Sequence, residues 1–173
     1  MRVLGIDPGS RHMGYGFVER VGTKYVCLAS GVLEPPEPEE LPARLTYLYD
    51  KLTEVFAQTR AREVSVEDVF IYKNPQSAFV LGQARAIALL AAHQAGARVF
   101  EYSPSRVKLA VACSGKATKE QVQRMIKVLL GLAKAPPSDE ADALANAVCH
   151  LDAFRAEVPK ASLILPELAI RRR

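Results

Sequence analysis

The sequence has little of what small secreted, zinc-bound or membrane proteins depend on. It contains 3 cysteines and none of them forms a CxxC pair, which excludes a disulfide framework or a cysteine-rich zinc module. The longest apolar run, residues 86–92, falls far short of the ~20 residues that span a bilayer. An acid at Asp7 interrupts the N-terminal apolar stretch too early for a signal peptide. We therefore expect a reduced, soluble, cytoplasmic protein.

The rest of the composition describes one domain with a small excess of positive charge. A chain of 173 residues is long enough to bury a core of its own, and it shows no internal repeat or low-complexity segment. A formal net charge of +4 permits binding to a polyanion without establishing it. We expect a single domain over residues 1–173, in which the basic segment 159–173 is a flexible end, a packed edge or an extra DNA contact.

Apolar periodicity and turn residues predict an alternation of strands and helices. Three strands forming an antiparallel meander, and two shorter strands after them, are expected at residues 2–7, 14–20, 25–33, 64–67 and 99–101. Helical stripes are expected over residues 41–56, 74–96, 104 onward, 118–130 and 139–148. The predicted fold class is therefore α/β, with a mixed five-stranded sheet flanked by helices. The alanine-rich helix 74–96 allows close approach by a neighbour, which is either the sheet or a second subunit.

Four carboxylates occur where such a fold can gather them. Asp7 ends an apolar run and Glu67 ends an alternating one, so both are expected at the ends of buried strands. Asp139 and Asp142 leave the same face of the last helix because they are three residues apart. A buried carboxylate without a partner costs several kcal/mol, and such acids therefore carry a proton, a counter-charge or a metal ion.

The helical pair also has a purely structural interpretation, because acids in a first turn complement the helix dipole. That interpretation suits Asp139 better than Asp142, which lies deeper among alanine and leucine and repels Asp139. A divalent cation relieves the repulsion, and hard oxygen ligands suit Mg²⁺ or Mn²⁺. Two such ions, ~3.5–4 Å apart, are what metal-assisted phosphodiester hydrolysis uses. The pattern predicts a metal-ion nuclease.

Several blocks of the sequence resemble a known family. They stand in the same order over nearly the whole chain: MRVLGIDPGS with GYG at 14–16, EDVF at 67–70, KN at 73–74, LGQAR at 81–85 and DEADALA at 139–145. Together they are similar to the bacterial crossover junction endodeoxyribonucleases of the RuvC family, the Holliday junction resolvases. The resemblance implies a ribonuclease H-like fold, a homodimer, and paired symmetric nicks at four-way junction DNA during homologous recombination and DNA repair.

The resemblance also implies roles for particular residues. Asp7, Glu67, Asp139 and Asp142 match the family's four catalytic, metal-binding acids, which hold two Mg²⁺ ions with Mn²⁺ as a substitute. The DNA-binding positions that match are Phe70, Lys108, Lys119 and, more weakly, Arg11. In the family the long alanine-rich helix contributes to the dimer interface, and a branch-migration complex of the RuvA and RuvB type is the expected partner.

Other interpretations stay open at this point. Phe70 can instead pack in the core, and a compact ribonuclease H-like enzyme that processes RNA, or a junction-binding protein without catalysis, shares part of the pattern. The Asp7-Pro8-Gly9 turn also resembles the phosphate-binding turn of actin and Hsp70-type ATPases, but those proteins need two related domains. His12, His93 and His150 show no ligand spacing, and we leave them out of the predicted site.

Overall fold

The computed structural model describes residues 1–37, 40–68 and 74–157. Phe70 and the basic segment 159–173, for which the sequence suggested DNA contacts, lie outside these residues. Within the described part of the chain, no helix is long and apolar enough to cross a membrane.

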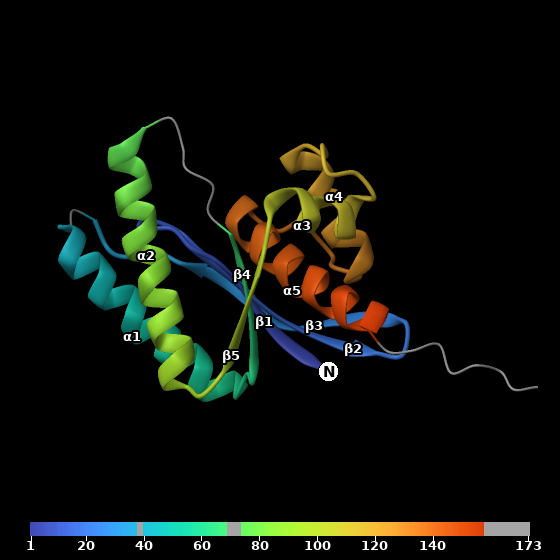
Figure 1. Ribbon diagram of the computed structural model, residues 1–173, viewed down its shortest axis with the longest axis horizontal. Helices are drawn as coiled ribbons and strands as arrows, with labels where there is room; N and C mark the ends of the chain where they lie inside the picture. Colours follow the sequence, from blue (N-terminus) through green and yellow to red (C-terminus); the bar gives the residue numbers. More distant parts are fainter. Residues whose placement is uncertain (38–39, 69–73, 158–173) are drawn as a thin grey trace, which may run out of the picture.

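A five-stranded mixed sheet forms the centre of the molecule (Figure 1). Its strands are β1 (Arg2–Asp7), β2 (Met13–Val21), β3 (Lys24–Leu33), β4 (Glu63–Glu67) and β5 (Arg98–Tyr102). The first three pair antiparallel, whereas β1, β4 and β5 run parallel, in the order β3-β2-β1-β4-β5. This arrangement confirms the predicted meander and the predicted mixed sheet.

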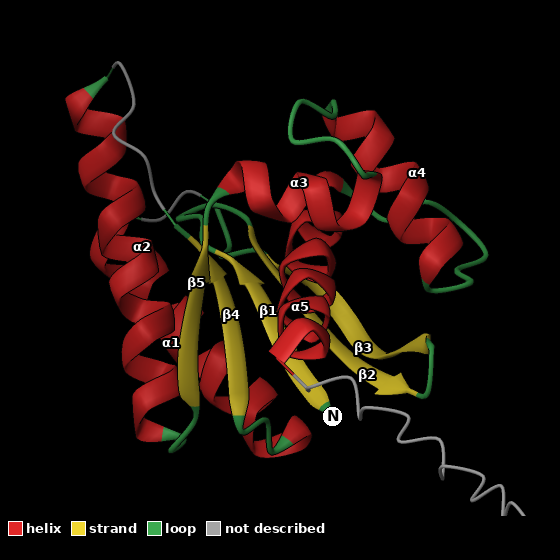
Figure 2. Ribbon diagram, turned by 45° about the vertical axis from the view of Figure 1, so that its right-hand side comes forward, coloured by secondary structure: helices red, strands yellow, loops and turns green. Residues whose placement is uncertain are grey.

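Helices cover both faces of the sheet (Figure 2). One face packs against α1 (Leu41–Thr59) and α2 (Pro75–Gln94). The other packs against α3 (Pro104–Ala112), α4 (Lys119–Leu129) and α5 (Ser138–Glu157). Each layer has its own hydrophobic core, so the sheet is buried on both sides.

Local sequence signals explain where two of the helices begin. The Oδ1 atom of Asn74 accepts hydrogen bonds from the backbone amides of Gln76 and Ser77, and these bonds cap α2. Thr118 and Gln121 form a capping box at the start of α4. Ser103 precedes α3 without capping it through its side chain, and its hydroxyl instead contacts that of Ser105 at 3.2 Å.

Helix α5 lies unusually close to the sheet because three glycines face it. A Cβ atom on Gly5 would stand 1.9 Å from the carbonyl oxygen of Ala143, and one on Gly14 would stand 1.9 Å from that of Asp139. Gly16, which pairs with Gly5 across β1 and β2, similarly leaves room for Leu144. Any side chain at these positions would push α5 outward, so the glycines determine how near the helix comes to the end of β1.

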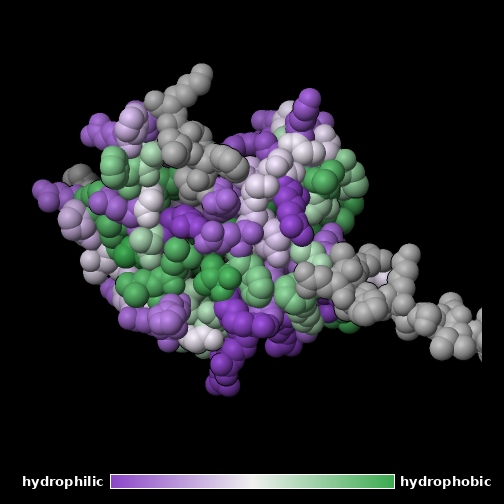
Figure 3. All heavy atoms as spheres, in the orientation of Figure 1, coloured by the Kyte–Doolittle hydropathy of each residue, from purple (hydrophilic) through white to green (hydrophobic). Residues whose placement is uncertain are grey.

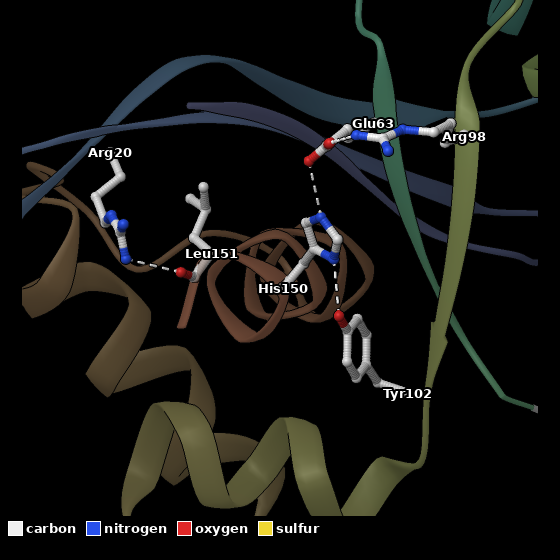
Figure 4. Close-up of polar contacts among 6 residues, drawn as sticks. All are labelled: Arg20, Glu63, Arg98, Tyr102, His150 and Leu151. Carbon is white, nitrogen blue, oxygen red and sulfur yellow. Dashed lines mark hydrogen bonds and ion pairs between the residues drawn. The ribbon is translucent and has the colours of Figure 1, made fainter. Parts of the chain in front are cut away.

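A buried polar chain holds the far half of α5 (Figure 4). The ring of His150 is fully buried, with Nδ1 2.8 Å from the hydroxyl of Tyr102 and Nε2 3.0 Å from Oε2 of Glu63. Arg98 pairs with the other oxygen of Glu63, and Arg20 donates a hydrogen bond to the carbonyl of Leu151 at 2.9 Å. These contacts join α5 to strands β2, β4 and β5. His150 is therefore structural, as its sequence context suggested.

Candidate active site

The parallel pairing of β1 and β4 places two carboxylates side by side. Ile6 is in register with Val66, so Asp7 and Glu67 occupy the next position on each strand, at the same edge of the sheet. Figure 2 shows α3 and the start of α5 standing beside that edge. The residues around it enclose a cleft of about 310 Å³, lined by Asp7, Pro8, Glu67, Asp68, Leu81, Pro104, Val107, Lys108, Lys119, Val122 and Asp142.

Helix α5 carries the other two predicted acids, and one of them reaches the cleft. Asp142 lines it, one turn from the helix start. Asp139 does not line it, but its negative charge acts on both Asp7 and Asp142. The close approach of the Asp139 backbone to Gly14, the residue paired with Asp7, is what brings this turn to the site.

Burial and mutual repulsion make these carboxylates hard to ionise. Burial, followed by the charges of Asp142, Glu67 and Asp139, raises the pKa of Asp7 from 3.8 to about 8. Burial also raises the pKa of Glu67 and of Asp142, each pushed further by a neighbouring acid. A bound cation would offset the repulsion between these carboxylates and would stabilise their ionised forms.

Two lysines supply the positive charge of the cleft. The Nζ atom of Lys119 lies 3.7 Å from Oδ2 of Asp142, and its side chain is 68% exposed. Lys108 comes from α3 and also lines the cleft, and its charge lowers the pKa of Glu67. Both cations therefore stand at the border between the carboxylates and solvent, where a phosphate entering the cleft would meet them.

The donor set fits hard divalent cations, although the side chains are not yet gathered around one. It consists of carboxylates, without thiolate or imidazole, and this is the chemistry that Mg²⁺ and Mn²⁺ prefer. Among residues 1–37, 40–68 and 74–157, no three acidic, histidine or cysteine side chains already converge closely enough to hold one ion.

Arg11 and His12, which follow Asp7 in the chain, do not line this cleft. The guanidinium of Arg11 is 3.1 Å from Oε1 of Glu37 on the exposed surface. His12 contacts Glu34 at 3.4 Å and is also exposed.

Sequence inspection missed Asn146. Its side chain is 1% exposed, and its amide Nδ2 donates a hydrogen bond to the carbonyl oxygen of Ile6 at 3.3 Å. It lies four residues after Asp142 and touches the residue just before Asp7, so it joins the two elements that carry the acids. Its Oδ1 has no hydrogen-bond partner within the described structure. The available signal was a lone amide inside the apolar run 143–148.

The strand order and the position of the acids define the class of protein. A mixed sheet with carboxylates ending two adjacent parallel strands, and a helix bringing further acids across them, is the arrangement of a ribonuclease H-like nuclease.

Comparison with known proteins identifies the family. The family model described as crossover junction endodeoxyribonuclease RuvC matches residues 3–150. A RuvC of Anaeromyxobacter sp. (strain Fw109-5) is 55% identical over 151 residues, covering 87% of this chain and 73% of that protein. A RuvC of Pelobacter propionicus is 47% identical over 164 residues, covering 95% and 93%. The chain belongs to the RuvC family of crossover junction endodeoxyribonucleases.

A solved structure extends the match to three dimensions. T. thermophilus RuvC, in complex with a Holliday junction substrate, superposes with a TM-score of 0.85 at 38% identity, over 91% of this chain and 96% of that one. The family and this similarity confirm the predicted fold and nuclease class, and they favour the junction nuclease over the RNA-processing alternative.

Proposed function

We propose that this protein resolves Holliday junctions, cutting opposite strands of four-way junction DNA by metal-assisted phosphodiester hydrolysis. The observation that carries the proposal is the cleft in which Asp7, Glu67 and Asp142 meet two lysines, on the fold of the RuvC family. Cleavage by paired symmetric nicks places the protein in homologous recombination and DNA repair. A junction-binding protein without catalysis does not require the electrostatic repulsion that the buried acids maintain.

The four carboxylates are the catalytic, metal-holding groups of the proposal. Asp7, Glu67, Asp139 and Asp142 would hold two Mg²⁺ ions, with Mn²⁺ as a substitute. When bound, such ions lower the pKa of an attacking water and stabilise the leaving oxygen. Lys108 and Lys119 offset the charge of the phosphate that enters the cleft. Val107 and Val122 form apolar parts of the wall.

Two nicks on opposite strands call for two such clefts, which a homodimer provides. The outer face of α2 supports this part of the proposal: Phe79 is 75% exposed and Leu90 is 46% exposed. Together with Pro75, Ala78, Gly82 and Ala86, Phe79 lines an apolar groove. Figure 3 shows hydrophobic surface following this helix. A twofold axis beside α2 would turn both clefts toward one junction, which a branch-migration complex of the RuvA and RuvB type would deliver.

A synthetic four-way junction tests the proposal. The protein is incubated with it in Mg²⁺ or Mn²⁺, cuts are mapped on all four strands, and Asp7→Asn serves as the control. Paired, symmetric, metal-dependent nicks that the control lacks are expected. Tight binding without cuts would leave a junction-recognition protein, and cleavage of single-stranded RNA in preference to the junction would favour the RNA-processing alternative.

A further inference from the structure

A second hollow adjoins the cleft on the other side of Leu81. It has a volume of about 450 Å³, and its lining is polar and basic: Ser10, Arg11, Arg44, Asn74, Gln76, Ser77, Val80 and Leu81. We call it the arginine hollow. Leu81 also lines the carboxylate cleft, so the two depressions share one wall. None of the described residues that line the hollow is an aspartate or a glutamate.

Arg44 has a hydrogen-bond donor that a ligand could satisfy. It projects from the first turn of α1, and its Nε is shielded from solvent without a hydrogen-bond partner in the described part of the chain. An arginine Nε–H is an obligatory donor, and leaving one unsatisfied away from water costs free energy. An anion in the hollow would supply the missing acceptor, and a planar guanidinium is suited to bind phosphate through two donors.

Arg11 can reach the same ligand at little cost. It now pairs with Glu37 at 3.1 Å, but the two side chains are 65% and 72% exposed. An ion pair so exposed contributes little to stability, so Arg11 can exchange its partner for a phosphate. The helix N-terminus beside it is not needed for binding, since Asn74 already accepts hydrogen bonds from the amides of Gln76 and Ser77.

We propose that the arginine hollow binds a backbone phosphate of the DNA strand that passes through the cleft, with Arg44 as its principal donor and Arg11 as its second. Arg11 lies in the turn that follows Asp7, so a strand whose scissile phosphate lies against the carboxylates continues over Leu81 toward the two arginines. The inference rests on the proposed function and adds a binding subsite to it. Such a contact positions the strand and carries no sequence preference.

The test measures junction affinity as a function of salt concentration. Asp7→Asn serves as the parent so that no cutting occurs, and Arg44→Gln is introduced into it. Loss of one phosphate contact is expected to lower the slope of log affinity against log salt by about 1, equally for junctions of different sequence. Arg62→Gln is the matched control. Arg62 is exposed and precedes β4, so it lies at the end of this strand away from the cleft. It is expected to leave the slope of the parent unchanged.

Several outcomes would overturn the inference. An Arg44→Gln protein that unfolds at the parent's temperature and keeps the parent's slope would show that Arg44 only packs, and an equal drop for Arg62→Gln would show a general effect of charge. If Arg44→Gln does not fold, Arg11→Gln at an exposed position decides by the same slope. A parent that does not bind junctions at all contradicts the proposed function instead, so the two failures remain distinguishable.

Discussion

The carboxylate cleft and the arginine hollow share a wall but use charge in opposite ways. The cleft gathers carboxyl groups from β1, β4 and α5, and burial raises the pKa of Asp7 among them. The hollow gathers cations from one turn and one helix, and it leaves Arg11 in solvent with an exchangeable partner. Buried acids with strongly shifted pKa values are typical of a catalytic site, whereas arginines with unused hydrogen-bond donors are typical of a binding site. Substitutions in the cleft should therefore reduce cleavage without reducing junction binding, and substitutions in the hollow should weaken binding.

The largest separation is expected for Asp142→Asn. The substitution removes a carboxylate from the cleft while lowering the repulsion that Asp7 experiences from it. Junction binding should stay the same or tighten, and the cleavage rate should fall by about 1,000-fold or more, on the order of 4 kcal/mol of transition-state stabilisation. Affinity measurements and single-turnover cleavage on the same junction check both. Loss of both activities together would indicate misfolding, and the comparison between cleft and hollow would not hold.

Gly5→Ala should damage the cleft through the backbone. The new Cβ would meet the carbonyl of Ala143 at 1.9 Å and the amide of Ala147 at 2.8 Å, so α5 must move away from β1. We expect a loss of about 3 kcal/mol in the free energy of unfolding, with cleavage falling further than affinity. Denaturant titration gives the first quantity.

Gly82→Ala is the matched control for that substitution. Gly82 lies within α2, and no atom of the described chain stands within 4 Å of the place that its Cβ would take. Within one protomer, alanine should therefore stabilise the helix by about 0.5–1 kcal/mol. If both glycine variants lost stability equally, the close packing of α5 would not be what Gly5 provides.

The electrostatic cost within the cleft predicts a pH dependence for the metal-free protein. The pKa of Asp7 is about 8 in the folded chain against an ordinary value of 3.8, so between these pH values the folded state retains a proton that the unfolded state has lost. Stability should therefore fall as pH rises from about 4 to 8. Asp7→Asn cannot ionise, and without divalent cations it should exceed the parent by about 5 kcal/mol at pH 8 and by almost nothing at pH 4.

Thermal unfolding at the two pH values, with and without Mg²⁺, measures this effect. Mg²⁺ should raise the melting temperature of the parent more than that of Asp7→Asn. Equal stability of the two proteins at pH 8 would mean that ionising Asp7 does not destabilise the folded protein.

The sequence predicted the cleft better than the hollow, and the reason is physical. Asp7 and Glu67 end recognisable apolar strands, and parallel pairing necessarily brings such ends together. Arg44 lies on an ordinary amphipathic helix, and nothing in its local sequence indicates that Leu81, from a separate helix, completes a hollow with it. The closeness of α5 was equally hidden, because Gly5 and Gly14 acquire their meaning only from the backbone atoms that face them.

The smallest expected effect concerns Asn146, which supports the cleft without entering it. Asn146→Leu removes the hydrogen bond to the Ile6 carbonyl but also removes the buried Oδ1 that has no partner in the described residues. These changes nearly cancel in stability. The tie between α5 and the residue before Asp7 is nevertheless lost, so the Mg²⁺ concentration for half-maximal cleavage should rise about 3-fold, or ~0.7 kcal/mol.

Ser65→Ala provides the control for Asn146, since it also removes a buried oxygen without a partner in the described chain but makes no hydrogen bond to β1 through its side chain. It should leave the Mg²⁺ dependence unchanged. If Asn146→Leu gave the same Mg²⁺ dependence as Ser65→Ala, the amide would serve packing alone, and the geometry of the cleft would rest on the glycine contacts and on the polar chain around His150.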